Sequence, residues 1–249
     1  MTGTDPAASS ATSAAGRSRG PVRALRRCLA AAGLVLGIGL AGHSLADDGP
    51  DHGRLDRFDA SDASASTRQV RAWVLETADN QGLPFLIVDK ISARVFAFDP
   101  EGRLLGAAPV LLGLARGDIS PPGIGNRPLA GIAPGERITP AGRFLASIGV
   151  NLGGKSILWI DYAAALSLHP VITTRPAERR LQRLTTVSAA DNRISYGCIN
   201  VPPTFYDEIV QSAFKGTTGV VYILPEVQSL PEVFFRAPRV AGQAPGGGR

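Results

Sequence analysis

The sequence has little cysteine and little histidine: two cysteines and three histidines in 249 residues. Cys28 lies in an N-terminal segment that we expect to be removed, so the remaining chain keeps Cys198 alone and can form no intramolecular disulfide. Only one histidine, His169, falls within the predicted folded region. One cysteine and one histidine cannot hold zinc unless carboxylates complete the site, and we predict neither a metal nor another cofactor.

Most of the chain also has almost no net charge. The formal net charge is +5, but residues 1–46 contain five arginines against the single acid Asp5. The rest of the chain therefore carries a net charge of only +1. Proteins that bind nucleic acid by neutralising phosphates need a concentrated basic face. We predict no nucleic-acid partner.

A long apolar run occurs near the N-terminus, at residues 29–42. The basic stretch 17–27 precedes it and His43–Ala46 follows, which is the order of a secretory signal. Fourteen residues in a helix span about 21 Å, less than the hydrocarbon core of about 30 Å. We predict a signal peptide at 1–46 and an exported protein of the periplasm or cell envelope. If the signal stays uncleaved, it anchors the same domain to the membrane.

The remaining chain divides into three parts by composition. Residues 47–66 are polar and acidic and are predicted to form a flexible tether. Residues 67–226 are predicted to be the folded domain, since apolar residues make up 44% of the chain and suffice for a buried core. Residues 227–249 are rich in proline and glycine and are predicted to be a disordered tail.

Strand patterns dominate the predicted domain. Apolar and β-branched segments predict strands at 85–89, 94–98, 104–112, 143–150, 156–162, 166–169 and 219–224. One helix is predicted at 68–79, capped by Thr67. Another is predicted to begin near Pro203 and to stop before Gly216. The fold class is therefore mainly β with a few short helices.

Two loops are longer than a compact domain needs. Residues 116–142 contain five prolines and six glycines, which excludes regular structure but limits backbone freedom. Residues 170–194 contain five arginines against two acids, with helical turns predicted at 176–184 and Leu181 and Leu184 facing inward. The arginines are either a solvated charged face or a patch for an anionic substrate. We predict that the two loops together form the substrate groove.

The segment Ser195–Asn200 places the thiol of Cys198 directly after Gly197. A glycine allows close backbone approach and leaves amide N–H groups free to point at a substrate carbonyl. A cysteine nucleophile also needs a base, because the thiolate attacks. His169 is the candidate base, and the carbonyl of Pro170 is the simplest group to hold its other nitrogen in one tautomer.

At these residues the sequence resembles the L,D-transpeptidases, whose catalytic domain is of the YkuD type. The family pattern is a histidine, a spacer, then Ser or Thr, usually His, Gly, Cys, an apolar residue, and Arg or Asn. Here it reads His169, a spacer of 25 residues, and Ser195 to Asn200. Residues 139–144 also resemble the family's Thr-Pro-x-Gly-x-Phe segment, and the likeness extends over 84–226.

The resemblance implies a YkuD-type β-sandwich and a peptidoglycan L,D-transpeptidase. It implies that Cys198 is the nucleophile and His169 its base, that Gly197 and Cys198 contribute to the oxyanion site, and that Ser195 and Asn200 support the motif. Stem peptides of peptidoglycan would be both acyl donor and acceptor. The predicted substrate-binding residues are Tyr196, Asn200, Arg193, Arg179 and Arg180.

The sequence departs from the family at two points, which favour an unusual substrate geometry. Tyr196 replaces the usual histidine, and the spacer is longer than is usual. Most relatives make 3,3 crosslinks, and the departures weakly favour the subgroup that makes 1,3 crosslinks.

Four other classes of protein could use a cysteine and a histidine of this kind, and the order of the residues counts against the first two. Papain-like and NlpC/P60-like peptidases place the cysteine before the histidine, and a sortase would need an arginine soon after Cys198, whereas the next ones are in the tail, from Arg236 onward. A cysteine carboxypeptidase or endopeptidase acting on stem peptides would use the same pair. A non-catalytic peptidoglycan-binding or scaffold protein would tolerate the loss of Cys198 or His169, and both are present.

Overall fold

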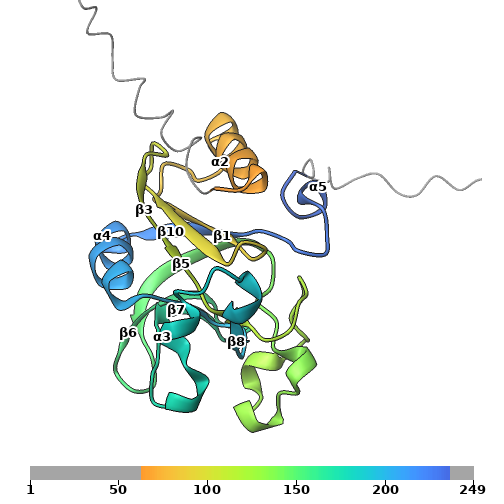
Figure 1. Cartoon of the computed structure of the whole chain (residues 1–249). Coiled ribbons are helices and arrows are strands. Elements are labelled where there is room, and N and C mark those ends of the chain that lie inside the picture. Colours follow the sequence, from red (N-terminus) through yellow and green to blue (C-terminus); the bar gives the residue numbers. More distant parts are fainter. Residues whose placement is uncertain (1–62, 236–249) are drawn as a thin grey trace, which may run out of the picture. The chain divides into compact units, whose positions relative to one another are not determined.

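A mixed sheet of eight strands organises the part of the chain that the computed structural model describes, residues 63–235 (Figure 1). The strand order is β3-β2-β1-β10-β5-β6-β7-β9. The bounds are β1 Phe85–Asp89, β2 Arg94–Phe98, β3 Leu104–Pro109, β5 Gly142–Val150, β6 Ser156–Asp161, β7 Leu166–Pro170, β9 Ile199–Val201 and β10 Thr218–Ile223. Two further strands, β4 Leu112–Gly113 and β8 Arg193–Ser195, form a separate parallel pair. The predicted mainly-β class with a few short helices is confirmed.

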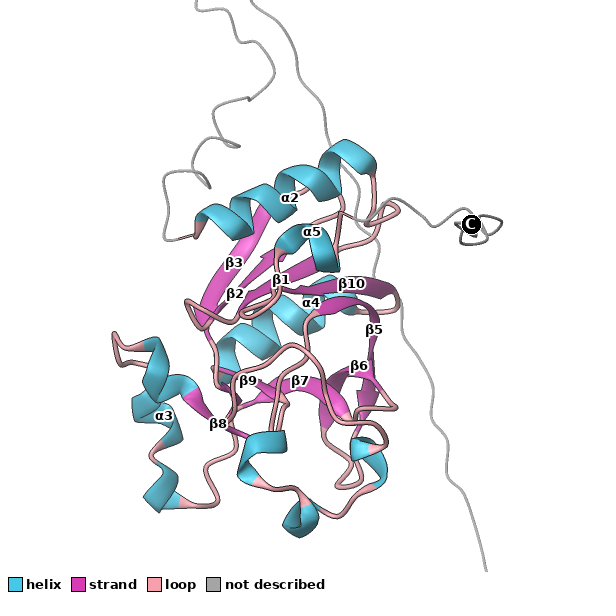
Figure 2. Ribbon diagram, turned by 90° about the vertical axis from the view of Figure 1, so that its right-hand side faces the viewer, coloured by secondary structure: helices cyan, strands magenta, loops and turns pink. Residues whose placement is uncertain are grey.

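The sheet separates two apolar cores because side chains alternate along each strand. In β1, Leu86 and Val88 face a core that also contains residues of β6, β7 and β9. Phe85 and Ile87 face a second core. The sheet therefore bends over, so that its two halves enclose the first core, while helices α2 (Ala65–Thr77) and α5 (Leu230–Val233) lie against the second (Figure 2).

Helix α2 begins earlier than the sequence predicted. Its N-cap is Ser64, whose hydroxyl oxygen accepts a hydrogen bond from the Thr67 amide at 3.1 Å. Thr67 lies inside the helix and is buried, with its hydroxyl on a carboxylate oxygen of Asp89. The helix ends at Thr77, where Ala78 adopts a left-handed conformation with φ of 51°. The predicted cap at Thr67 is therefore wrong, and the ordered domain includes residues 63–66.

The domain also continues past its predicted end at Glu226. Residues 230–233 form α5, and Phe234 is buried against Trp73 of α2 and Tyr222 of β10. The predicted disorder at 227–235 is wrong, because these aromatic rings cover the second core. The predicted signal peptide, Cys28, nearly all of the tether and the last 14 residues lie outside the described part of the chain. Between residues 63 and 235 no helix has the length and apolarity to cross a membrane.

The second predicted helix is confirmed, with a wider turn than expected. It runs from Pro203 to Phe214 and contains a π-helical stretch at Phe205–Val210, followed by α4 (Gln211–Phe214). Its side chains Phe205, Tyr206, Val210 and Phe214 are buried in the first core.

The two long loops contain only short helical turns. In the proline-rich loop these are at Ile124–Asn126, Leu129–Gly131 and Pro134–Glu136. In the arginine-rich loop they are at Pro176–Glu178, α3 (Arg180–Arg183) and Ala189–Asn192. Leu184 is buried as predicted, but Leu181 is 53% exposed, which corrects its predicted inward orientation.

Candidate active site

Strands β7 and β9 bring His169 and Cys198 together. The strands are parallel neighbours in which His169 lies opposite Asn200 and Leu168 lies opposite Ile199. Leu168 and Ile199 point into the first core. Because alternate side chains point to opposite faces, Ser167, His169, Cys198 and Asn200 share the other face. Neither β8 nor β9 was predicted, because each has only three residues, but they hold the two ends of the catalytic motif.

The imidazole of His169 is held in one tautomer. Its Nδ1 lies 2.8 Å from the carbonyl oxygen of Pro170, which can only accept a hydrogen bond. In the neutral imidazole Nδ1 therefore carries the proton, and Nε2 is the nitrogen that can accept one. The predicted orienting role of the Pro170 carbonyl matches this geometry.

Asn200 holds the same imidazole from the other side. The guanidinium of Arg180 donates to Oδ1 of Asn200 at 2.7 Å, so the amide Nδ2 faces Nε2 of His169 at 3.3 Å. Arg180 in turn donates to the carboxylate of Glu178 at 2.5 Å. Asn200 is buried. It was predicted to support the motif and to bind substrate; in the structure it contacts the imidazole and also lines the larger cavity described below.

The sulfur of Cys198 has polar neighbours as well as the imidazole. The hydroxyl of Ser167 donates to it at 3.5 Å, and the thiol lies 3.4 Å from the carbonyl oxygen of Ala165. Burial acts to raise the pKa of the Cys198 thiol, but the hydrogen bond and charge of His169, with further hydrogen bonds from Ser167, outweigh it and lower that pKa. The surroundings therefore favour the thiolate.

The pKa of His169 moves in the opposite direction. Burial acts to lower it, but the hydrogen bond with Cys198 and the charge of the thiolate raise it above its ordinary value, and the Pro170 carbonyl adds to this. A lowered thiol pKa beside a raised imidazole pKa favours a thiolate–imidazolium pair, the reactive form of a cysteine nucleophile.

The turn before Cys198 is fixed by three side-chain contacts. The hydroxyl of Ser195 donates to the carbonyl of Cys198 at 2.6 Å and accepts from the Gly197 amide at 3.1 Å. The hydroxyl of Thr139 donates to the Gly197 carbonyl at 2.7 Å. Gly197 has φ of +133°, and a Cβ there would lie 2.8 Å from the carbonyl oxygen of Ile138, so only glycine fits.

The Ser195 contact changes the predicted oxyanion site. Because the Gly197 amide already donates to Ser195, it is not free to donate to a substrate oxygen, contrary to the prediction. The two hydrogen bonds of the Ser195 hydroxyl therefore orient the turn before Cys198. The resemblance also names Cys198 at the oxyanion site, and that part of the prediction stays a prediction.

Two cavities meet at Cys198. The larger has a volume of about 540 Å³ and the smaller about 150 Å³, and Leu129, Tyr196 and Cys198 line both. The arginine-rich loop contributes Ile172, Thr174, Arg175, Glu178 and Arg180 to the larger cavity. The proline-rich loop contributes Ser120, Ile124, Gly125, Arg127, Leu129, Ile132, Ile138 and Pro140 to the smaller. Both long loops therefore surround the thiol.

Tyr196 stands on the wall between the cavities. Its ring is covered by the guanidinium of Arg137, which lies 4.0 Å from the ring centroid. Such a contact stiffens an aromatic side chain that would otherwise turn freely. The predicted position of Tyr196 beside the thiol agrees with the structure.

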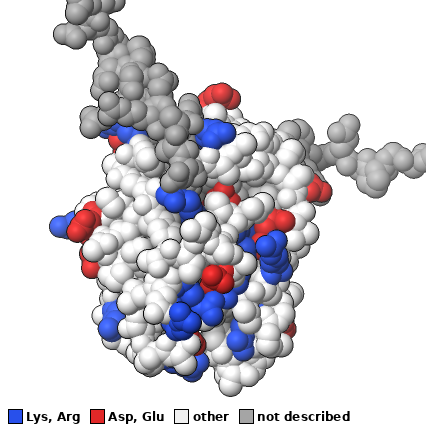
Figure 3. Space-filling model, viewed as in Figure 1, with Lys and Arg blue, Asp and Glu red and all other residues white. Residues whose placement is uncertain are grey.

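The other predicted arginines have different surroundings. Arg180 lines the larger cavity, whereas Arg179 bonds to Gln182 and lies along two separate surface hollows. Arg193 donates to the carboxylate of Glu226 at 2.6 and 3.1 Å and lines neither cavity. The predicted substrate contacts of Arg179 and Arg193 are therefore not supported by their positions. On the side of the molecule drawn in Figure 3, basic and acidic side chains are interspersed.

Ser167 and Thr139 were given no role in the sequence analysis. The position of Ser167 could have been predicted from the sequence, because a residue two positions before His169 on the same strand points to the same face of the sheet. Thr139 lay in the Thr-Pro-Ala-Gly segment, but no sequence pattern links it to Gly197, 58 residues away. Within the described part of the chain, no three His, Cys, Asp or Glu side chains are grouped to hold a metal ion.

Comparison with known proteins gives matches among solved structures only. No protein-family model and no curated protein matches the sequence. An L,D-transpeptidase of Enterococcus faecium matches with 17% identity and a TM-score of 0.33, over 56% of this chain and 49% of that one. The catalytic domain of an E. faecium L,D-transpeptidase matches with 18% identity and a TM-score of 0.32, over 56% and 95%.

A third match is the helical cell shape determining protein Pgp2 of Campylobacter jejuni. It has 15% identity and a TM-score of 0.38, over 59% of this chain and 49% of that one. The chain thus spans about half the length of this protein and of the longer E. faecium structure.

Proposed function

We propose that this protein is a cysteine acyltransferase that crosslinks peptidoglycan stem peptides, an L,D-transpeptidase. One observation supports this above the others. The imidazole of His169, fixed by the Pro170 carbonyl at 2.8 Å, lies beside the thiol of Cys198 where two cavities meet, and each of the two groups shifts the pKa of the other. A nucleophile with an oriented base and two approaches suits a reaction with two substrates.

The proposed reaction has two steps. The thiolate of Cys198 attacks a carbonyl carbon of the donor stem, the carbon–nitrogen bond breaks, and the leaving amine takes the proton from the His169 imidazolium. A thioester results. An acceptor amine then attacks the thioester carbonyl, His169 takes a proton from that amine, and the carbon–sulfur bond breaks to restore the thiolate. One amide bond is broken and one is made, so no other reactant is needed.

The larger cavity suits the anionic donor. Arg175 and Arg180 line it, and only Glu178 opposes them in charge. Arg175 is mainly exposed and 3.6 Å from Glu178, so its remaining donors are available to a stem-peptide carboxylate. The smaller cavity, on the far side of Leu129 and Tyr196, is then left for the acceptor amine.

Tyr196 supports the narrower proposal that the crosslinks are of the 1,3 type. A tyrosine ring held by Arg137 is larger and stiffer than the usual histidine, and it limits the donor length that fits beside the thiol. We expect Tyr196→His to shift the donor preference from short stems toward those of ordinary relatives. Unchanged donor ranking among dipeptide, tripeptide and tetrapeptide stems in this variant would contradict the 1,3 assignment.

The experiment is incubation of the purified full chain with defined stem peptides, with mass spectrometry of the products. Wild-type protein is expected to give crosslinked peptides and a covalent adduct with a carbapenem. Cys198→Ala is expected to give neither. Cys28→Ala is the matched control, because it removes the other cysteine, and it should behave as wild type.

The products also separate the proposal from hydrolysis. Shortened peptides without crosslinks would show a carboxypeptidase or endopeptidase instead. Adduct formation by Cys198→Ala at the wild-type rate would refute the nucleophile. Mass spectrometry of the secreted protein likewise tests the proposed export, since cleavage after Ala46 leaves Asp47 as its first residue.

A further inference from the structure

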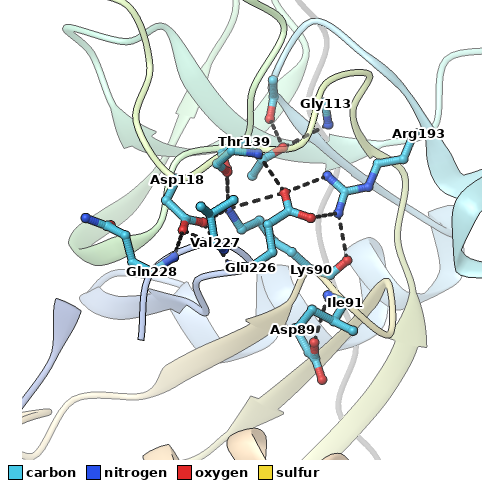
Figure 4. A network of polar contacts seen from close by, with 12 residues as sticks. Asp89, Lys90, Ile91, Gly113, Asp118, Thr139, Arg193, Glu226, Val227 and Gln228 are labelled. Carbon is cyan, nitrogen blue, oxygen red and sulfur yellow. Dashed lines mark hydrogen bonds and ion pairs between the residues drawn. The ribbon is translucent and has the colours of Figure 1, made fainter. Parts of the chain in front are cut away.

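A buried lysine lies beneath the catalytic turn, where no charged group was predicted. Lys90 follows β1, and its side chain is fully buried. Its ammonium donates to the carbonyl of Gly117 at 2.5 Å, to the carboxylate of Asp118 at 2.7 Å and to the carbonyl of Thr139 at 2.9 Å (Figure 4). All three donors of an ammonium are therefore used.

These three partners belong to the two ends of the proline-rich loop. Gly117 and Asp118 open the loop and Thr139 closes it, with the residues of the smaller cavity wall between them. One side chain thus fixes the distance between the ends of a segment that has only short helical turns of its own. Such a contact shortens the free loop and restricts the conformations of its wall.

Neighbouring charges balance the buried ammonium. The carboxylate of Asp118 also accepts from the amides of Glu226, Val227 and Gln228. Glu226 lies 3.7 Å from Lys90 and pairs with Arg193, which begins the strand leading to Ser195. Two cations and two carboxylates make the cluster neutral, and burial lowers the pKa of Lys90. An unpaired buried charge would cost far more than this arrangement.

Thr139 links the cluster to the nucleophile. Its carbonyl accepts from Lys90, while its hydroxyl accepts from the Gly113 amide at 2.8 Å and donates to the Gly197 carbonyl at 2.7 Å. Gly197 directly precedes Cys198 in the chain. The path from the lysine to the catalytic turn is therefore two hydrogen bonds through one buried residue.

We propose that Lys90 and Thr139 are positioning residues. Lys90 bonds to both ends of the proline-rich loop, a contact that we call the clasp, and so fixes the wall of the smaller cavity. Thr139 connects the clasp to the turn that carries Cys198 and so holds that turn in place. The inference rests on the proposed function in taking Cys198 as the nucleophile and the smaller cavity as the acceptor's. On this inference the buried cluster stabilises the fold and also fixes the shape of the cavity proposed for the second substrate.

Lys90→Met with Glu226→Gln tests the clasp without unbalancing the charge. The double variant removes one cation and one anion, and the amide oxygen of the introduced glutamine can still accept from the Gly117 amide that now bonds to Glu226. Hydrogen exchange followed by mass spectrometry is expected to become at least about tenfold faster in residues 119–138 and unchanged in β5. Glu226→Gln alone is the matched control and should keep the slow exchange. Equal exchange in the double variant and this control would overturn the clasp.

Thr139→Val and Thr139→Ser test the link to the turn. Valine keeps the shape but loses both hydrogen bonds, whereas serine keeps them. A small displacement of a nucleophile costs up to about a hundredfold in rate. We expect Thr139→Val to slow carbapenem acylation by about ten- to a hundredfold, with its alkylation profile by iodoacetamide shifted to higher pH, and Thr139→Ser to restore both.

The outcomes distinguish this inference from the proposed function. If wild-type protein transfers no stem peptide, the proposed function fails, but the exchange and alkylation results still decide on the clasp and the link. If both Thr139 variants alkylate with the wild-type pH profile, the positioning inference is wrong, whatever the peptide products. Measured unfolding midpoints show whether each variant keeps its fold, and the comparison of Thr139→Val with Thr139→Ser tests the link independently of the Lys90 double variant.

Discussion

Replacing His169 with glutamine tests the central feature of the site, the imidazole beside the thiol. Glutamine is polar and of similar length, and it cannot accept a proton at neutral pH. The amide can still donate to the Pro170 carbonyl, but the positive charge next to Cys198 is lost. Burial of the sulfur remains, and burial alone favours the neutral thiol.

The size of the effect follows from the thiolate population. A free cysteine, with a pKa of about 8.5, has about one molecule in thirty ionised at pH 7, and burial of Cys198 makes the ionised fraction in the variant smaller still. Loss of the proton donor to the leaving amine adds to this. We therefore expect acylation to fall by about two to four orders of magnitude at pH 7, the range for a positioned general acid–base group.

The pH dependence provides the sharper assay. Because the pKa of Cys198 is lowered, wild-type alkylation by iodoacetamide is expected to begin its rise at lower pH than for a free cysteine. Transfer should also decline at high pH, as the imidazolium, whose pKa is raised, loses its proton. In His169→Gln the alkylation rise should move to higher pH. His52→Gln, which changes the other histidine after the predicted signal, is the control.

Two results would refute this reasoning. One is acylation of His169→Gln at pH 7 at a rate close to that of wild type, which would show that another group activates the sulfur. The other is an alkylation profile that stays unchanged in the variant. In that case the lowered thiol pKa would have to come from Ser167 and the backbone alone.

Further predictions concern the neighbours of this pair. Arg180→Gln is expected to slow acylation by a carbapenem by about ten- to a hundredfold, because the Arg180 side chain both orients Asn200 and lines the larger cavity. Arg179→Gln is the control and should leave that rate unchanged. Ser167→Ala is expected to raise the pH at which Cys198 is alkylated, since it removes a donor to the thiolate, and an unchanged profile would contradict this. Tyr222→Phe removes a hydrogen bond of 2.5 Å to the carboxylate of Asp79 and should lower the free energy of unfolding in urea by about 1.5–3 kcal/mol; no loss would show that Arg143 alone satisfies that carboxylate.

Some features could be predicted from the sequence because they depend on local chemistry. Alternating apolar residues gave the strands of the sheet, and Gly197 before Cys198 marked a tight turn at a thiol. The orienting carbonyl of Pro170 was predictable because it is the next residue after His169. The pairing of the only two candidate groups followed from the scarcity of cysteine and histidine.

Other features were beyond local reasoning because they join distant segments. The sequence does not distinguish the arginines of the 170–194 loop from one another. In the structure Arg180 lines the larger cavity, Arg193 pairs with Glu226, and Arg179 lines separate surface hollows. Which arginine reaches the site depends on where β8 and β9 return to the sheet. Those strands have three residues each and no pattern that a sequence window can detect.

The sequence by itself determined the mainly β class and which groups are candidates for the chemistry, one cysteine with one histidine as its proposed base. The tertiary structure decided its setting: the polar chain from Glu178 to His169, the occupied amide of Gly197, and the buried cluster around Lys90. The physical reason is that a buried charge is stable only with partners of opposite charge and matching geometry. Lys90 finds those partners in Asp118 and Glu226, far along the chain, and only folding brings them together.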